Sequence, residues 1–100
     1  MTAQAEPDGD RLALAGRIHA DNVVDIRRRG EQWLASRSPG STACVDLSAV
    51  TGASSVLLSL LFCLRRRADS LQITLTYAGA RGDLLELARL NGVSRWLTAS

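Results

Sequence analysis

Apolar and polar residues alternate along two stretches of the chain, and a third stretch is continuously apolar. The segment 11–16, RLALAG, alternates over a short distance, and 71–77, LQITLTY, shows the clearest two-residue period. Alternation of this kind predicts β-strands with one buried face. The apolar, turn-bounded segment 43–48, ACVDLS, predicts a central strand. The residues up to about Gly9 are expected to be either flexible or an edge strand that is weakly held.

Three other stretches carry apolar residues at spacings of three and four, which predicts helices. The first follows Asp21-Asn22, a capping pair, and ends before the Pro-Gly turn at 38–41. The second, 54–67, is apolar around most of its circumference and should be heavily buried. The third begins at Asp83, which with Glu86 has the spacing of a capping box, and stops at Gly92. Residues 93–97 are expected to close against the core as a short strand or turn.

The order of these elements predicts an α/β fold, in which a small, largely parallel sheet packs against about three helices. A length of 100 residues, with 46% hydrophobic and 22% charged residues, is ordinary for one globular domain. We therefore expect a flexible segment or edge strand over residues 1–9 and a single domain over 10–100.

Residues suited to catalysis are scarce, and we expect no enzymatic activity. His19 is the sole histidine, and no paired carboxylates or glycine-rich phosphate loop accompany it. The glycines at 79, 82 and 92 have the positions of turn and cap residues. Cys44 and Cys63 lie in apolar stretches without metal-ligand spacing, so we expect them to be small core residues. No cofactor or metal is predicted.

The charge pattern argues against nucleic acid as a partner, because the net charge is only +2. All twelve basic residues are arginine, and two triplets, 27–29 and 65–67, lie on predicted helices. Such triplets usually form a solvated face; the alternative is contact with an acidic partner or anionic lipid headgroups. The longest apolar run, 56–64, is too short to span a bilayer. These features, with an acidic N-terminal stretch in place of a secretory signal, predict a cytoplasmic protein.

The most informative motif is the strand-loop-helix unit 45–55, VDLSAVTGASS, followed by the apolar helix. This unit, the strand at 71–77 and the helical segment LLELARLNGV together resemble the STAS family over about residues 10–97. The resemblance implies the STAS-like, or SpoIIAA-like, α/β fold. In the family, a strand ending in a DLS-type motif precedes a loop and a hydroxyl-bearing residue at the start of a buried helix.

Counted from Asp46, Ser55 falls on the family's hydroxyl residue, and Ser54 stands where the family usually has Asp. Val56 replaces the small residue that normally follows. The resemblance implies that Ser55 contacts a partner or is phosphorylated, and it implies a partner-binding surface of Thr51, Gly52, Ser54, Ser55 and Val56. A phosphate there would be favoured by the N-terminus of the helix. The plainer alternative is that Ser54 or Ser55 only caps the helix.

Two functions within the family follow from this loop. Loss of the Asp and gain of Val favour the STAS subunit of a Mla-type phospholipid-transport ABC complex, which maintains outer-membrane lipid asymmetry in Gram-negative bacteria. That reading implies binding to the ATPase subunit of a complex containing a permease, and a position peripheral to the inner membrane. The alternative is an anti-sigma-factor antagonist switched by phosphorylation of Ser55. A small ligand-binding or catalytic module is a third hypothesis. An exposed partner face would also permit self-association.

Overall fold

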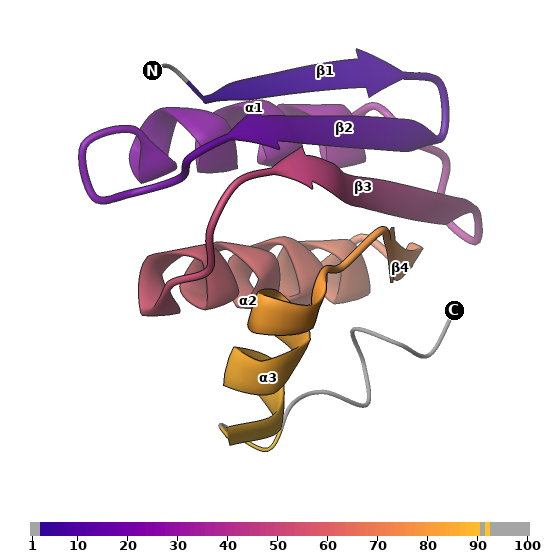
Figure 1. The fold of residues 1–100 in the computed structure, drawn as a ribbon. Coiled ribbons are helices and arrows are strands. Elements are labelled where there is room, and N and C mark those ends of the chain that lie inside the picture. Colours follow the sequence, from indigo (N-terminus) through magenta and orange to yellow (C-terminus); the bar gives the residue numbers. More distant parts are fainter. Residues whose placement is uncertain (1–2, 91, 93–100) are drawn as a thin grey trace.

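The computed structural model describes residues 3–90 and 92, which form four strands and three helices. Their order along the chain is β1-β2-α1-β3-α2-β4-α3 (Figure 1). The strands are β1 (Gln4–Asp8), β2 (Arg11–Gly16), β3 (Thr42–Val50) and β4 (Thr74–Ala78). The helices are α1 (Val23–Ala35), α2 (Ser55–Ser70) and α3 (Gly82–Leu90).

The sheet is mixed and largely parallel, with strand order β1-β2-β3-β4. The hairpin strands β1 and β2 pair antiparallel, whereas β2 with β3 and β3 with β4 pair parallel. The two parallel pairs arise because α1 and α2 each carry the chain back to the end of the sheet at which the previous strand began. The predicted α/β class and the largely parallel sheet are confirmed. The opening segment forms the edge strand β1.

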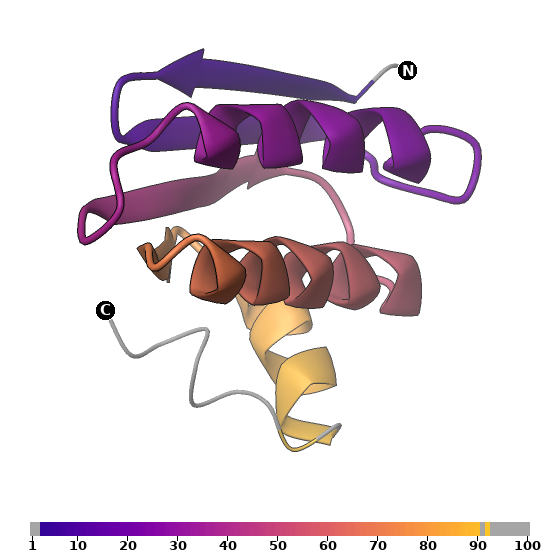
Figure 2. The same cartoon turned by 180° about the vertical axis from the view of Figure 1, so that it is seen from behind.

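One face of the sheet is covered by α1 and α2, which lie side by side (Figure 2). The core lies between these helices and the sheet, where Leu12, Leu14 and Val45 meet Leu61 and Leu64 with essentially no solvent exposure. The two helices approach closely at Gly30, where an added Cβ would lie 2.7 Å from Leu64 Cδ2. Glycine at this position of α1 therefore lets the helices pack together.

The boundary between α2 and β4 differs from the sequence prediction. The helix runs to Ser70, three residues beyond the predicted end, and β4 begins only at Thr74, so Leu71 and Ile73 lie outside the strand. The amide of Leu71 donates to the Arg67 carbonyl at 3.1 Å and that of Ile73 to the Ala68 carbonyl at 2.9 Å. These bonds close the helix C-terminus, and Gln72 takes a left-handed conformation with φ 61°. The alternating pattern extends past the strand because Ile73 is buried against the helix end.

The start of α3 is also different, because the predicted capping box does not form. The helix begins at Gly82, and the Leu85 amide donates to the Arg81 carbonyl at 2.9 Å. Asp83 therefore lies inside the first turn, where its carboxylate accepts from the Leu84 amide at 2.9 Å. Glu86 pairs instead with Arg89, one turn further along. The expected strand or turn at 93–97 lies outside the described residues.

The prediction that the two cysteines are core residues is wrong: both are free thiols, and neither belongs to the core. Cys44 and Cys63 are both partly exposed. Cys44 alternates with buried Ala43 and Val45 and therefore points to the opposite face of β3. Cys63 lies on the outer side of α2, whereas Leu61 and Leu64 of the same helix face the sheet. An apolar run in the sequence does not distinguish these faces.

Candidate functional site

The loop between β3 and α2 is held at its base and exposed along its length. The Thr51 amide donates to the Gly16 carbonyl at 2.9 Å, which ties the loop to the end of β2. Gly52 has φ +76°, a conformation that side-chain-bearing residues rarely adopt. Thr51, Gly52 and Ala53 are all exposed. The hydrogen bond at the base and the left-handed conformation of Gly52 together give the exposed loop a defined shape.

Ser54 is the N-cap of α2. Its backbone is extended, with φ −154° and ψ 162°, and its Oγ accepts from the Leu57 amide at 3.1 Å. This bond satisfies one of the amides that have no partner inside the helix. Of the two serines proposed as caps from the sequence, the structure therefore assigns that role to Ser54.

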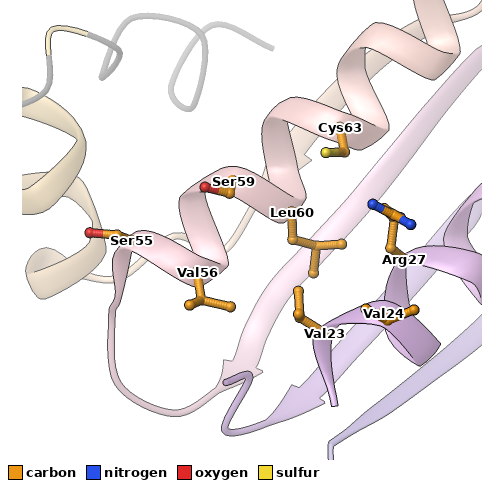
Figure 3. Close-up of a pocket in the computed structure, with 8 residues that line it drawn as sticks. All are labelled: Val23, Val24, Arg27, Ser55, Val56, Ser59, Leu60 and Cys63. Carbon is orange, nitrogen blue, oxygen red and sulfur yellow. The ribbon is translucent and has the colours of Figure 1, made fainter. Parts of the chain in front are cut away.

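Ser55 is the first residue of α2, and its side chain is exposed. In the part of the chain that the structure describes, no hydrogen bond involves its hydroxyl group. The hydroxyl points away from α1 (Figure 3), whereas Val56 is half-buried beside that helix. Thus Ser54 takes part in the local fold, and Ser55 is available to a partner at the positive end of the helix dipole.

Two further side-chain contacts involve β3 and β4, the strands that precede and follow α2 in the chain. Asp46 Oδ1 accepts from the Ser48 amide at 3.0 Å, and this bond, helped by Arg11 3.3 Å from the other carboxylate oxygen, lowers the pKa of Asp46. The buried Tyr77 hydroxyl donates to the Leu61 carbonyl at 2.5 Å. Burial raises the pKa of Tyr77, so it remains a neutral donor. The second contact fixes α2 against β4.

Sequence reasoning missed the residues that α1 contributes beside the loop. Val23, Val24 and Arg27 face Val56 and Ser59 of α2 across a groove of about 320 Å³ (Figure 3). They are about thirty residues away in the chain, so no local motif connects them to the loop. The sequence held one signal: Val24 is an apolar residue directly after Val23, which departs from the three- and four-residue spacing of its helix. In the structure Val24 is 52% exposed.

Within residues 3–90 and 92, no group of three or more metal-ligating side chains is placed to hold a metal ion. His19 lies in the β2–α1 loop, where its amide donates to Asn22 Oδ1 at 3.0 Å. None of the described helices has the length and apolar character needed to cross a bilayer.

Comparison with known proteins places this geometry in a class. The fold is that of SpoIIAA-like domains: the anti-sigma factor antagonist SpoIIAA in its unphosphorylated form aligns with TM-score 0.74 at 12% identity, over 95% of this chain and 84% of that chain. An anti-sigma factor antagonist from Mycobacterium paratuberculosis aligns with TM-score 0.68 at 20% identity, over 94% and 80%. At these identities the likeness shows the fold alone.

The sequence itself identifies the family. A model described as "Mlab, STAS domain" matches residues 1–99, so the chain belongs to the STAS family and is most like its MlaB branch. No curated protein sequence matches the chain. The family resemblance and fold predicted from the strand-loop-helix motif are confirmed.

The different roles of the two serines lead to a test by matched substitutions. Ser54→Ala removes the N-cap bond and is expected to lower the free energy of unfolding by about 1 kcal/mol. Ser55→Ala removes a hydroxyl without an internal partner and should change it by less than about 0.5 kcal/mol. Urea unfolding followed by circular dichroism measures both. Equal losses would contradict the assignment of Ser54 as the cap.

Proposed function

We propose that this protein is a non-catalytic STAS subunit that binds the ATPase subunit of a phospholipid-transport ABC complex. The observation that carries the proposal is that the two serines at the start of α2 have different roles. Ser54 caps the helix, which leaves Ser55 and the exposed loop 51–53 free for a partner. The match to the MlaB-labelled model supports this branch of the family. The docking surface comprises Thr51, Gly52, Ser55 and Val56, with Ser54 shaping it from within.

In this role the domain stabilises its partner by contact and carries out no reaction. A loop that is held at its base loses less conformational entropy on binding than a flexible loop does. This difference favours tight binding. The protein would then lie in the cytoplasm, held near the inner membrane through the ATPase and permease. Its contribution would be to the maintenance of outer-membrane lipid asymmetry.

Purification from the native host tests the partner. A tagged full-length chain is expected to co-purify with an ABC ATPase and its permease in near-stoichiometric amounts. The matched control is the same chain with Ser55→Arg, which should lose both proteins. Recovery of a sigma-factor-regulating kinase in place of the ATPase would overturn the proposal.

Phosphorylation of Ser55 in an anti-sigma-factor antagonist is the second candidate function. The observation that favours it is the exposed hydroxyl at the first position of a helix, where a phosphate would be stabilised by free amides and the helix dipole. Intact-mass and peptide mass spectrometry of protein from its host distinguishes the two. Stoichiometric phosphate on Ser55 would favour the switch, and its absence under all growth conditions would favour the transport subunit.

A further inference from the structure

The groove between α1 and α2 continues well beyond the loop. Its first part is mainly apolar, with Val23, Val24 and Val56 among the residues that line it. A second part of about 290 Å³ follows toward the C-terminal end of α2 and is lined by Arg27, Glu31, Cys63, Arg66, Arg67 and Ser70. The two parts share Arg27 and Cys63, so they form one continuous surface. We call this surface the α1–α2 groove.

Short side chains of α2 line much of the groove, beside the longer, buried Leu60. Val56, Ser59 and Cys63 lie on the outer side of α2, one helical turn apart (Figure 3). The longer Leu61 and Leu64 of the same helix point into the core and leave this line of the surface hollow. A hollow between two helices, with exposed Val24 at its rim, leaves apolar surface in contact with water.

The second part of the groove, toward the C-terminal end of α2, is positively charged. It carries three arginines and one carboxylate, Glu31, which gives a net charge of +2. Glu31 lies 3.9 Å from Arg27 and partly neutralises it. Arg66 and Arg67 are exposed, and neither has an acidic partner within the part of the chain that the structure describes. An occupant should therefore be apolar at one end and acidic at the other.

The shape of the groove selects the kind of occupant. The groove follows α2 from Ser55 to Ser70, which at 1.5 Å per residue is roughly 22 Å, or about four helical turns. It is open to solvent, so a single acyl chain would remain half in water, whereas small-molecule sites enclose most of their ligand. A flat membrane surface could not enter the hollow. An amphipathic helix would fill it and keep its polar face in solvent.

We propose that the α1–α2 groove binds an amphipathic helix of a protein partner, with apolar side chains against Val24 and Val56 and acidic side chains against Arg66 and Arg67. The inference rests on the proposed function only for the identity of that partner, because the groove begins at Ser55 and Val56 and is continuous with the loop surface.

Site-specific photo-cross-linking tests the occupant. Benzoylphenylalanine replaces Ser59 in the groove, or Thr51 in the loop, in the full-length chain expressed in its native host, and mass spectrometry maps the cross-linked segment. From position 59 we expect a protein segment with apolar residues spaced three and four apart and Asp or Glu at one end. A cross-link to phospholipid, to a second copy of this chain or to a segment without acidic residues would overturn the proposal.

The two positions separate this proposal from the proposed function. Cross-links to an ABC ATPase from both positions support both. ATPase captured from position 51 with no product from position 59 overturns the groove alone. An acidic helix of a different protein captured from position 59 supports the groove and overturns the ATPase as its partner. No product from either position overturns both.

A synthetic peptide of the cross-linked segment then tests the charge complementarity. Fluorescence anisotropy should give a dissociation constant about tenfold weaker for Arg66→Glu, because attraction is replaced by repulsion. The matched control is Arg28→Glu, a charge reversal on the exposed surface of α1 outside the groove, which should change it less than about twofold. Equal effects of the two substitutions would overturn the proposed orientation of the helix.

Discussion

Ser55→Arg is expected to abolish binding to the ATPase subunit while the domain remains folded. The residue is exposed at the first position of α2, so the longer side chain extends into solvent in the free protein. In a complex formed through this surface, the same side chain would hold the partner away from loop residues 51–53. Loss of a well-packed contact at an interface centre weakens binding by about hundredfold or more.

Isothermal titration calorimetry with the purified ATPase subunit measures the effect, and circular dichroism checks the fold. Ser38→Arg provides the matched control, because Ser38 is an exposed residue of the α1–β3 turn, before the start of β3, whereas the proposed docking loop follows the end of β3. We expect Ser38→Arg to bind like the unmodified chain. If Ser55→Arg folds and binds with unchanged affinity, the loop is not the docking surface.

Gly79→Ala is expected to lower the free energy of unfolding by about 2–5 kcal/mol. Gly79 has φ +76°, and a residue with a Cβ loses about 1–2 kcal/mol in that conformation. The added Cβ would also lie 2.8 Å from the Ser48 backbone nitrogen and 2.9 Å from Ser48 Cβ. Ser48 cannot easily move, since its amide donates to Asp46 and its carbonyl accepts from Arg81 at 3.0 Å. Overpacking against fixed backbone adds about 1–3 kcal/mol.

Gly40→Ala separates the two causes. Gly40 has φ +85°, but no atom lies within 4 Å of the position that a Cβ would take. Only the conformational penalty applies there, so we expect a loss of about 1–2 kcal/mol. Guanidinium unfolding monitored by tryptophan fluorescence, to which the buried Trp33 contributes, gives both values. Equal losses for the two variants would show that the approach of Gly79 to Ser48 does not contribute.

The local pattern of apolar and polar residues was sufficient to predict most of the strands and helices. The alternating segment 11–16 and the apolar segment 43–48 became adjacent parallel strands, and helices formed at all three predicted places. The errors occurred at boundaries: α2 ends at Ser70 because its last turn is closed by the amides of Leu71 and Ile73. Hydrophobic periodicity does not encode where a helix C-terminus finds its hydrogen bonds.

Part of the candidate site could also be predicted from the sequence. The strand-loop-helix motif located Ser54 and Ser55 because capping chemistry and family spacing are both local. The division of roles between them required the hydrogen bond from the Leu57 amide to Ser54 Oγ. The groove required more, because Val24 and Arg27 meet Ser59 only after α1 and α2 pack on one face of the sheet.

By itself, the sequence determined the α/β class, the family and the serine pair at the start of α2, because periodicity and capping act over a few neighbouring residues. Only the tertiary structure decided that Ser55 remains available while Ser54 caps the helix, and that an apolar groove with a basic end continues from Val56 toward Arg66. Those properties depend on which faces of separate helices meet. That meeting is governed by packing around Gly30 and Leu64, which no local pattern records.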